Sequence, residues 1–154
     1  MERKAVSAVM LTLLLIGSLA LTFNVEPVEA SGTIYIRANG LVEGTNKITS
    51  ADNITYTFID NITDYIVIQR SNIIVNGNGW TLQGPTGSGY GFSLSGITNV
   101  TIKNTNIKNF AYGVYLISSS NNNIVIGNNI TKCSQIGIYL SGSRGNTVSG
   151  NTIT

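Results

Sequence analysis

The stretch Asn123–Thr131 reads NIVIGNNIT, and further along the chain Asn146–Thr154 reads NTVSGNTIT. Six of the nine positions are identical. A third and more divergent copy, NVTIKN, lies upstream at Asn99–Asn104. Short β-branched runs that recur at a regular spacing, separated by Asn and Gly, are typical of a solenoid in which each repeat forms one turn.

A second element recurs between these copies and begins with glycine. It reads GFSL at Gly91–Leu94, GVYL at Gly113–Leu116 and GIYL at Gly137–Leu140. Leucine-rich repeats have a similar spacing, but the chain lacks their recurrent leucine pattern. The two elements together predict a parallel β-helix, because inward aliphatic residues stack from turn to turn while Asn and Gly accept the tight corners. We therefore assign the chain to the all-β class, with about five turns in the solenoid.

The register of this stack depends on which residues are aligned. One alignment places Ile102 under Val125 and Val125 under Val148, whereas a second alignment, longer by one position, places Asn99 under Asn123. A slip of one position reverses the inward and outward faces of a strand. We expect the register that aligns the aliphatic residues, because misplaced core volume costs more than a misplaced corner asparagine.

Some residues between the aliphatic positions are also expected in the interior or at its corners. Trp80 follows a Gly-Asn-Gly turn, and we expect it in or near the core. The single Cys133 has no partner for an internal disulfide, so it is either a buried small hydrophobic residue, which we favour, or an unpaired thiol. Asparagines at matching corners are expected to form amide ladders, namely Asn123 with Asn146 and Asn128 with Asn151.

Residues 1–30 have the features of a secretory signal peptide: a basic start, an uncharged apolar run over 5–23, and small residues at positions three and one before Ser31. The alternative is an uncleaved N-terminal anchor, because the apolar run is just long enough to span a bilayer. Either alternative places the remaining chain outside the cytoplasm. We therefore expect an extracellular or cell-surface protein, which contacts a membrane only if the N-terminal segment is uncleaved.

The remaining chain divides at the point where the acidic residues end. We predict an N-terminal cap and first turn over 31–64 and parallel β-helix repeats over 65–154, because an uncapped solenoid end invites edge-to-edge association. The chain stops inside a repeat at Thr154. We therefore expect the last repeat to be incomplete and further repeats or domains to follow the C-terminus.

Four segments are more distinctive than the repeats themselves: Thr33–Gly40, Ile66–Ile68, Asn72–Gly84 and Asn99–Asn104. Together they resemble the NosD-type right-handed β-helix family, which is also described as carrying the CASH (carbohydrate-binding and sugar hydrolysis) repeat. The resemblance covers nearly all of 31–154. It implies a right-handed parallel β-helix in an exported surface protein, with carbohydrate as a ligand, and it also implies periplasmic copper binding.

The charged and metal-ligating residues argue against several kinds of chemistry. Charged residues make up 10% of the chain, and a net charge of +2 offers no phosphate-neutralising patch, so no nucleic-acid partner is expected. Copper sites use His, Cys or Met, but past residue 30 the chain has only Cys133, so we expect no metal and no cofactor. Glycoside hydrolysis uses two carboxyl groups, and no acid follows Asp64. We expect no catalytic residue, and we interpret Asp52, Asp60 and Asp64 as turn acids.

Four tyrosines form the candidate binding site. The aliphatic neighbours of Tyr115 and Tyr139 are expected to face inward, so both tyrosines face outward one turn apart. Tyr90 and Tyr112 each precede the glycine of the second element. The four side chains predict an aromatic strip for stacking on sugar rings, although tyrosine also simply suits a half-exposed strand. The loop 84–91 is the largest departure from regularity and the loop most expected to carry a site.

We predict an exported, non-catalytic surface or carbohydrate-binding module with a polysaccharide or glycan as its partner. The alternatives are the N-terminal part of a polysaccharide-acting hydrolase or lyase, and a structural envelope or adhesion repeat. Four sequons predict N-glycosylation of an exported chain, at Asn53, Asn61, Asn99 and Asn129.

Overall fold

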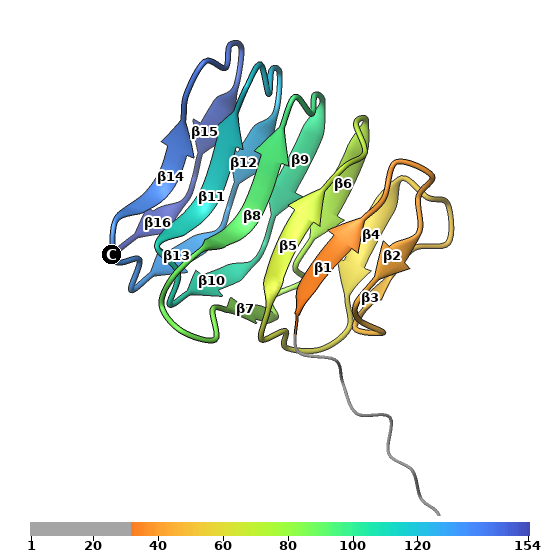
Figure 1. The fold of residues 1–154 in the computed structure, drawn as a ribbon, viewed down its shortest axis with the longest axis horizontal. Coiled ribbons are helices and arrows are strands. Elements are labelled where there is room, and N and C mark those ends of the chain that lie inside the picture. The colour runs from red at the N-terminus through yellow and green to blue at the C-terminus, as the bar shows by residue number, and fades with distance from the viewer. Residues whose placement is uncertain (1–31) are drawn as a thin grey trace, which may run out of the picture.

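The computed structural model describes residues 32–154, which form sixteen β-strands and no helix. Successive strands return to three sheets, and strands of successive turns pair in parallel, so the chain winds as a parallel β-helix, as expected (Figure 1). Sheet A has the order β14 (Ile136–Leu140), β11 (Tyr112–Ile117), β8 (Tyr90–Ser95), β5 (Tyr65–Ile68), β1 (Thr33–Ile36) and β2 (Val42–Glu43). Sheet B has the order β15 (Thr147–Ser149), β12 (Ile124–Ile126), β9 (Val100–Lys103), β6 (Ile73–Asn76), β4 (Thr55–Phe58) and β3 (Ile48–Thr49). Sheet C has the order β16 (Thr152–Ile153), β13 (Asn129–Thr131), β10 (Asn106–Lys108) and β7 (Thr81–Gln83).

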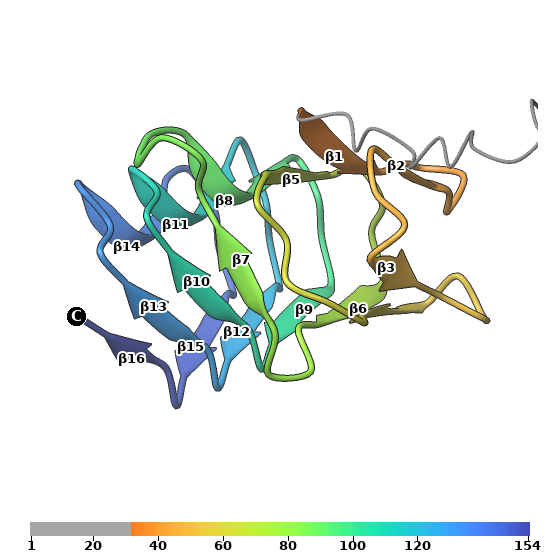
Figure 2. The ribbon, with the colours of Figure 1, turned by 90° about the horizontal axis from the view of Figure 1, so that it is seen from below.

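Each full turn contributes one strand to each sheet, and Figure 2 shows the three sheets wrapped around a common interior. The described residues contain four such turns, from β5–β6–β7 to β14–β15–β16, preceded by an incomplete turn with β1 and β4. The expectation of about five turns therefore counted an incomplete turn as a whole one. No helix long and apolar enough to cross a membrane occurs in residues 32–154. The predicted signal peptide or anchor, 1–30, lies outside the described residues.

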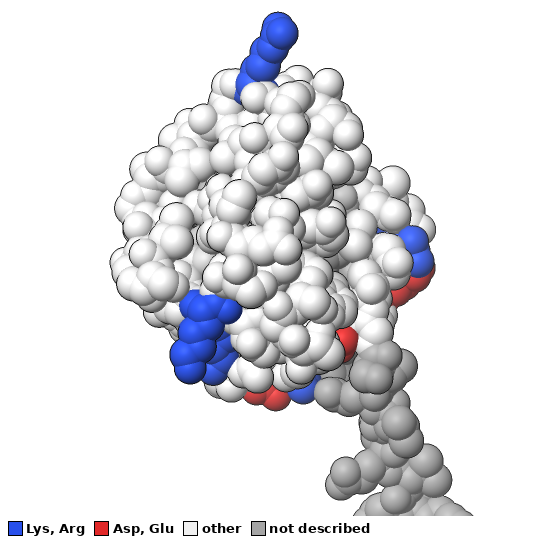
Figure 3. Space-filling view, turned by 60° about the vertical axis from the view of Figure 1, so that its left-hand side comes forward, with Lys and Arg blue, Asp and Glu red and all other residues white. Residues whose placement is uncertain are grey.

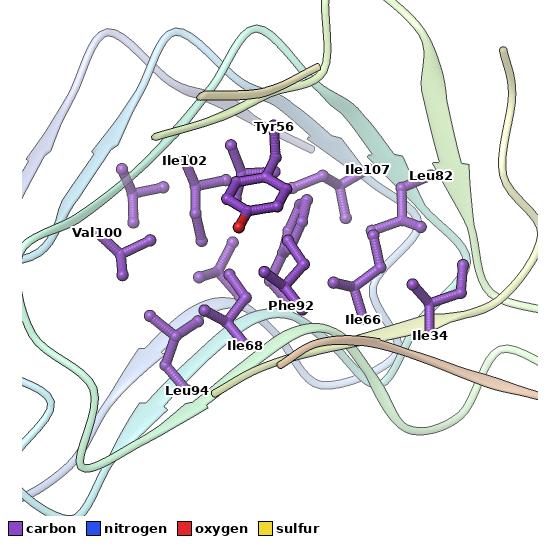
Figure 4. Packing of buried hydrophobic residues seen from close by; sticks show 14 of the residues in the cluster. Ile34, Tyr56, Ile66, Ile68, Leu82, Phe92, Leu94, Val100, Ile102 and Ile107 are labelled. Carbon is purple, nitrogen blue, oxygen red and sulfur yellow. The ribbon is translucent and has the colours of Figure 1, made fainter. Parts of the chain in front are cut away.

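The aliphatic register predicted from the sequence is confirmed. Ile102 pairs with Val125, and Val125 in turn pairs with Val148. Ile102 and Val125 are buried in the core, whereas Val148, in the last turn, is 45% exposed. Figure 4 shows aliphatic residues from all three sheets meeting around Tyr56 and Phe92. Burying one such aliphatic side chain stabilises the fold by about 1.5–3 kcal/mol, so a slip of one position would lose this gain on every strand.

The recurrent glycine of the second element is required by close packing between turns. A Cβ atom on Gly113 would lie 2.6 Å from the carbonyl oxygen of Gly137 and 2.7 Å from Cγ2 of Ile130. A Cβ atom on Gly91 would meet the carbonyl oxygen of Gly113 in the same way. The glycine therefore recurs because each turn lies directly on the backbone of the next.

Asparagine side chains satisfy the backbone at the corners between sheets. Asn128 is 2% exposed; its Nδ2 donates to Oδ1 of Asn151 at 3.0 Å, and its Oδ1 accepts from the backbone N–H of Thr105 at 3.1 Å. This confirms one predicted amide ladder. In the other pair the backbone N–H of Asn123 donates to Oδ1 of Asn146 at 2.8 Å, but Nδ2 of Asn123 donates to the carbonyl of Ile97 at 2.9 Å instead of to Asn146.

The N-terminal edge of the stack differs from the regular turns. Strand β2 pairs antiparallel with β1, and β3 pairs antiparallel with β4. The nearby acids bind turn backbone: Oδ1 of Asp52 accepts the N–H groups of Thr55 at 2.8 Å and Ile54 at 2.9 Å, which lowers the pKa of Asp52. Asp60 and Asp64 accept backbone N–H groups in the same way.

The expectation that Trp80 lies in or near the core is wrong. Trp80 is 36% exposed and occupies the turn before β7, where its backbone N–H donates to the carbonyl of Gly77 at 2.8 Å. The inward position of that strand belongs to Leu82, which is fully buried. Cys133 is half-buried and packs against the core, and this burial raises the pKa of its thiol.

Candidate functional site

The outer face of sheet A is the aromatic face of the molecule. Six of the seven tyrosines lie in its strands, whereas the seventh, Tyr56 of β4, points into the core. The six are Tyr35 in β1, Tyr65 in β5, Tyr90 in β8, Tyr112 and Tyr115 in β11, and Tyr139 in β14. Such a distribution does not follow from the inward aliphatic pattern, because that pattern is common to all three sheets.

The four tyrosines predicted from the sequence form one group, which we call the tyrosine cluster: Tyr90, Tyr112, Tyr115 and Tyr139. The ring of Tyr115 stacks on that of Tyr139 with centroids 5.1 Å apart and an angle of 11° between the planes. On its other side Tyr115 lies 4.2 Å from Tyr90. Tyr112 contacts the other three rings at centroid distances of 5.2 to 5.5 Å.

Members of the cluster differ in what they offer a ligand. Tyr115 lies on β11 between β8 and β14, so the rings of Tyr90 and Tyr139 cover it from both sides. This desolvation, together with the neighbouring Tyr90 hydroxyl, raises the pKa of Tyr115. Tyr90, at the β8 end of the cluster, is 38% exposed. The end rings are therefore better placed than Tyr115 to stack on a ligand.

A hollow of about 330 Å³ lies beside Tyr90. The hollow is explained by a row of outward side chains that pair across neighbouring strands of sheet A. In this row Val67 pairs with Tyr35 on one side and with Ser93 on the other, and Ser93 pairs with Tyr115. Two small residues, Val67 and Ser93, thus lie between Tyr35 and Tyr115, and they leave a depression in the surface. The hollow is lined by Thr33, Tyr65, Ile66, Val67, Gly89, Tyr90 and Ser93.

The irregular loop 84–91 forms one wall of this hollow. Gly89 has a φ of +68°, and a Cβ atom there would lie 2.5 Å from Cε1 of Tyr65, so only glycine lets the loop close on that ring. The Tyr65 hydroxyl and the Thr86 hydroxyl share a hydrogen bond of 3.3 Å. On its inner side the Tyr65 ring packs 6.0 Å from Phe110. These contacts hold the wall in place.

Sequence reasoning missed Tyr65, Val67 and Ser93 as parts of the site. The available signal was the alternation in YIVI and YGFSLS, which places all three side chains outward. Their partnership across the strands was hidden, because Ile66 lies opposite Phe92 and the offset from β5 to β8 is therefore longer than the spacing of the later turns.

The N-terminal end of the aromatic face carries a charged group. The guanidinium of Arg37 lies 4.0 Å from the ring centroid of Tyr35, its Nε donates to Oε2 of Glu43 at 2.8 Å, and its Nη1 donates to Oε1 of Gln69 at 3.2 Å. The bond to Glu43 raises the pKa of Arg37. Arg37 and the ring of Tyr35 are thus engaged with each other rather than with the tyrosine cluster.

The four predicted glycosylation sites are all exposed but differ in hydrogen bonding. The glycan would be attached to Nδ2. The Nδ2 of Asn99 donates to Oδ1 of Asn72 at 3.0 Å, and the Nδ2 of Asn129 donates to Oδ1 of Asn106 at 3.4 Å. At Asn61 only Oδ1 is engaged, by the N–H of Thr81. The side chain of Asn53 lies against Gly40. Modification at Asn53 or Asn61 therefore disturbs less of the stack, and glycosylation stays a prediction.

The molecule is therefore a β-solenoid that carries an aromatic surface on the outer face of one of its three sheets. The family model described as periplasmic copper-binding protein (NosD) matches residues 24–154, and the chain therefore belongs to the NosD family. The periplasmic description is consistent with an exported protein. Searches of curated proteins and of solved structures gave no match.

The copper in the family description does not fit the donor groups of residues 32–154. Copper is held by imidazole, thiolate or thioether ligands. Among the described residues there is no His and no Met, and no three residues of His, Cys, Asp or Glu come together. The one thiol, Cys133, packs against the core, and its raised pKa opposes the thiolate form that binds metal.

Proposed function

We propose that the protein is an exported, non-catalytic β-helix module that binds carbohydrate at the outer face of sheet A. The observation that carries this proposal is the tyrosine cluster, in which four rings from three successive turns contact one another on a single outer face. A hollow adjoins the cluster at Tyr90.

The chemistry of this face matches that of a sugar. A pyranose ring has an apolar face of C–H groups and a rim of hydroxyls, so it pairs with an aromatic ring that also carries a hydroxyl. The rings of the cluster support one another, which lowers the entropy lost when a ligand orders them. Tyr90 and Tyr139, at the ends of the cluster, are the proposed stacking residues.

The acidic side chains of the described residues support binding rather than hydrolysis. Hydrolysis uses two carboxyl groups on either side of the scissile bond. Glu43 is paired with Arg37, and Asp52, Asp60 and Asp64 accept backbone N–H groups near the N-terminal edge. We further propose that export carries the module to the cell surface or beyond, where polysaccharides are available to it.

The test is a glycan array followed by calorimetric titration of the oligosaccharide that binds best. The Tyr90→Ala/Tyr139→Ala double variant is expected to bind at least about tenfold more weakly, since each lost stacking contact contributes about 0.5–1.5 kcal/mol beyond its buried area. Trp80→Ala is the matched control, because Trp80 is an exposed aromatic residue outside sheet A. Absence of binding to any glycan, or equal binding by the double variant, would refute the proposal.

A further inference from the structure

The hollow beside Tyr90 is a candidate subsite within the proposed carbohydrate-binding face, with a volume of about 330 Å³. Val67 and Ser93 are small outward residues that pair across β5 and β8, and the larger side chains of Tyr65 and Tyr90 also line the hollow. We infer that this hollow holds one ring of an uncharged sugar, and that it selects neutral glycans over those that contain uronic acid. The inference rests on the proposed function and adds to it a particular subsite and a class of ligand.

The lining is mostly apolar and includes the aliphatic hydroxyl side chains of Ser93 and Thr33. Val67 and the Tyr90 ring offer apolar surface to the C–H face of the sugar. Ser93 and Thr33 supply hydroxyl groups for its rim. The Tyr65 hydroxyl is held by Thr86, so this wall does not have to be ordered by the ligand.

The charges around the hollow disfavour an anionic ligand. The strands of sheet A from β5 to β14 contain only uncharged residues. Asp64 directly precedes Tyr65, and its carboxylate accepts the N–H of Gly32, next to Thr33 in the lining. Arg37, which follows β1, is already paired with Glu43.

The surface beyond the hollow continues this uncharged character. Figure 3 views the molecule toward its C-terminal strands and shows a broad uncharged surface, with basic and acidic side chains at its margins. A carboxylate brought to this face would lose hydration without gaining a cationic partner in the strands of sheet A from β5 to β14, whereas a neutral hydroxyl-rich ring avoids this penalty.

The test fills the hollow while leaving all four residues of the tyrosine cluster unsubstituted. Ser93→Trp places a large side chain in the hollow, whereas Ser95→Trp places the same side chain outward on the same strand but outside the lining. Both substitutions put a residue that favours strands at an outward position, so equal unfolding temperatures of the variants are checked first. Neutral gluco-, manno- and galacto-oligosaccharides and an oligogalacturonide of equal length are titrated by calorimetry.

The expected result is binding of a neutral oligosaccharide at least tenfold tighter than the oligogalacturonide, lost in Ser93→Trp and kept in Ser95→Trp. Binding that survives Ser93→Trp overturns the subsite but leaves the proposed function to the Tyr90/Tyr139 test. An oligogalacturonide that binds as tightly as the neutral sugars overturns the ligand class. If the wild-type protein binds none of these sugars but binds another glycan of the array, this inference fails alone; if it binds no glycan at all, the proposed function fails with it.

Discussion

The outer face of sheet A and the outer faces of sheets B and C rest on the same kind of interior. Beneath each sheet, alternate residues are buried aliphatics, such as Leu116 in β11 and Ile107 in β10. Outside, sheet A carries tyrosine, whereas outward positions of the other sheets carry residues such as Thr101, Lys108 and Asn129. Folding explains the interior of all three sheets, but it does not explain why the tyrosines gather on one exterior.

The first and largest prediction tests whether the interiors are truly equivalent. Leu116→Ala beneath sheet A and Ile107→Ala beneath sheet C are each expected to lower the free energy of unfolding by about 2–5 kcal/mol, because both side chains are fully buried and would leave a cavity. Urea unfolding measures both. The outward neighbour Lys108→Ala is the control and should change stability by less than about 0.5 kcal/mol. A marked difference between the two core variants would show that the interiors beneath sheets A and C are not equivalent.

The second prediction concerns the contact that brings successive turns of sheet A together. Gly113→Ala is expected to lower the free energy of unfolding by about 1–3 kcal/mol, because the added Cβ meets the Gly137 carbonyl oxygen and Ile130. The shift of β11 should also disturb the tyrosine cluster, which near-ultraviolet circular dichroism would detect. Gly32→Ala serves as the control, since a Cβ atom added there would meet no other atom within 4 Å. Unchanged stability of Gly113→Ala would mean that the turns tolerate a wider separation.

The repeat predicted the interior and the tyrosine cluster but not the hollow, and the reason is the spacing between turns. Ile102, Val125 and Val148 follow one another at a constant offset, so the alignment of the later turns followed directly from the sequence. The hollow depends instead on the pairing of Val67 with Ser93. The spacing between these two residues along the chain is longer than that of the later turns, because the loop 84–91 lies between them. The prediction for Trp80 was wrong for a related reason. Its hydrophobicity suggested burial, but strand β7 begins one position later, at Thr81, so Trp80 does not occupy an inward strand position.

The smallest expected effect, a dependence of stability on alkaline pH, sharpens the contrast between buried and outward tyrosines. Desolvation raises the pKa of Tyr115, on the exterior, and that of Tyr56, in the core, above the ordinary value of 10.0. A raised pKa in the folded protein means that the stabilisation is complete below pH 10 and is lost as the pH rises through the folded pKa.

Tyr115→Phe should therefore match the wild-type free energy of unfolding at pH 7 and lose less of it between pH 9 and about pH 11, because phenylalanine has no proton to release. Urea unfolding across this range measures the difference. Tyr56 contributes in both proteins, since its buried hydroxyl donates to the carbonyl of Gly40 at 2.9 Å, so part of the alkaline loss should remain. Identical pH profiles for the two proteins would show that the ring contacts of Tyr115 leave its hydroxyl as well hydrated as in the unfolded chain. The tyrosine cluster would then be a looser surface than its ring distances imply.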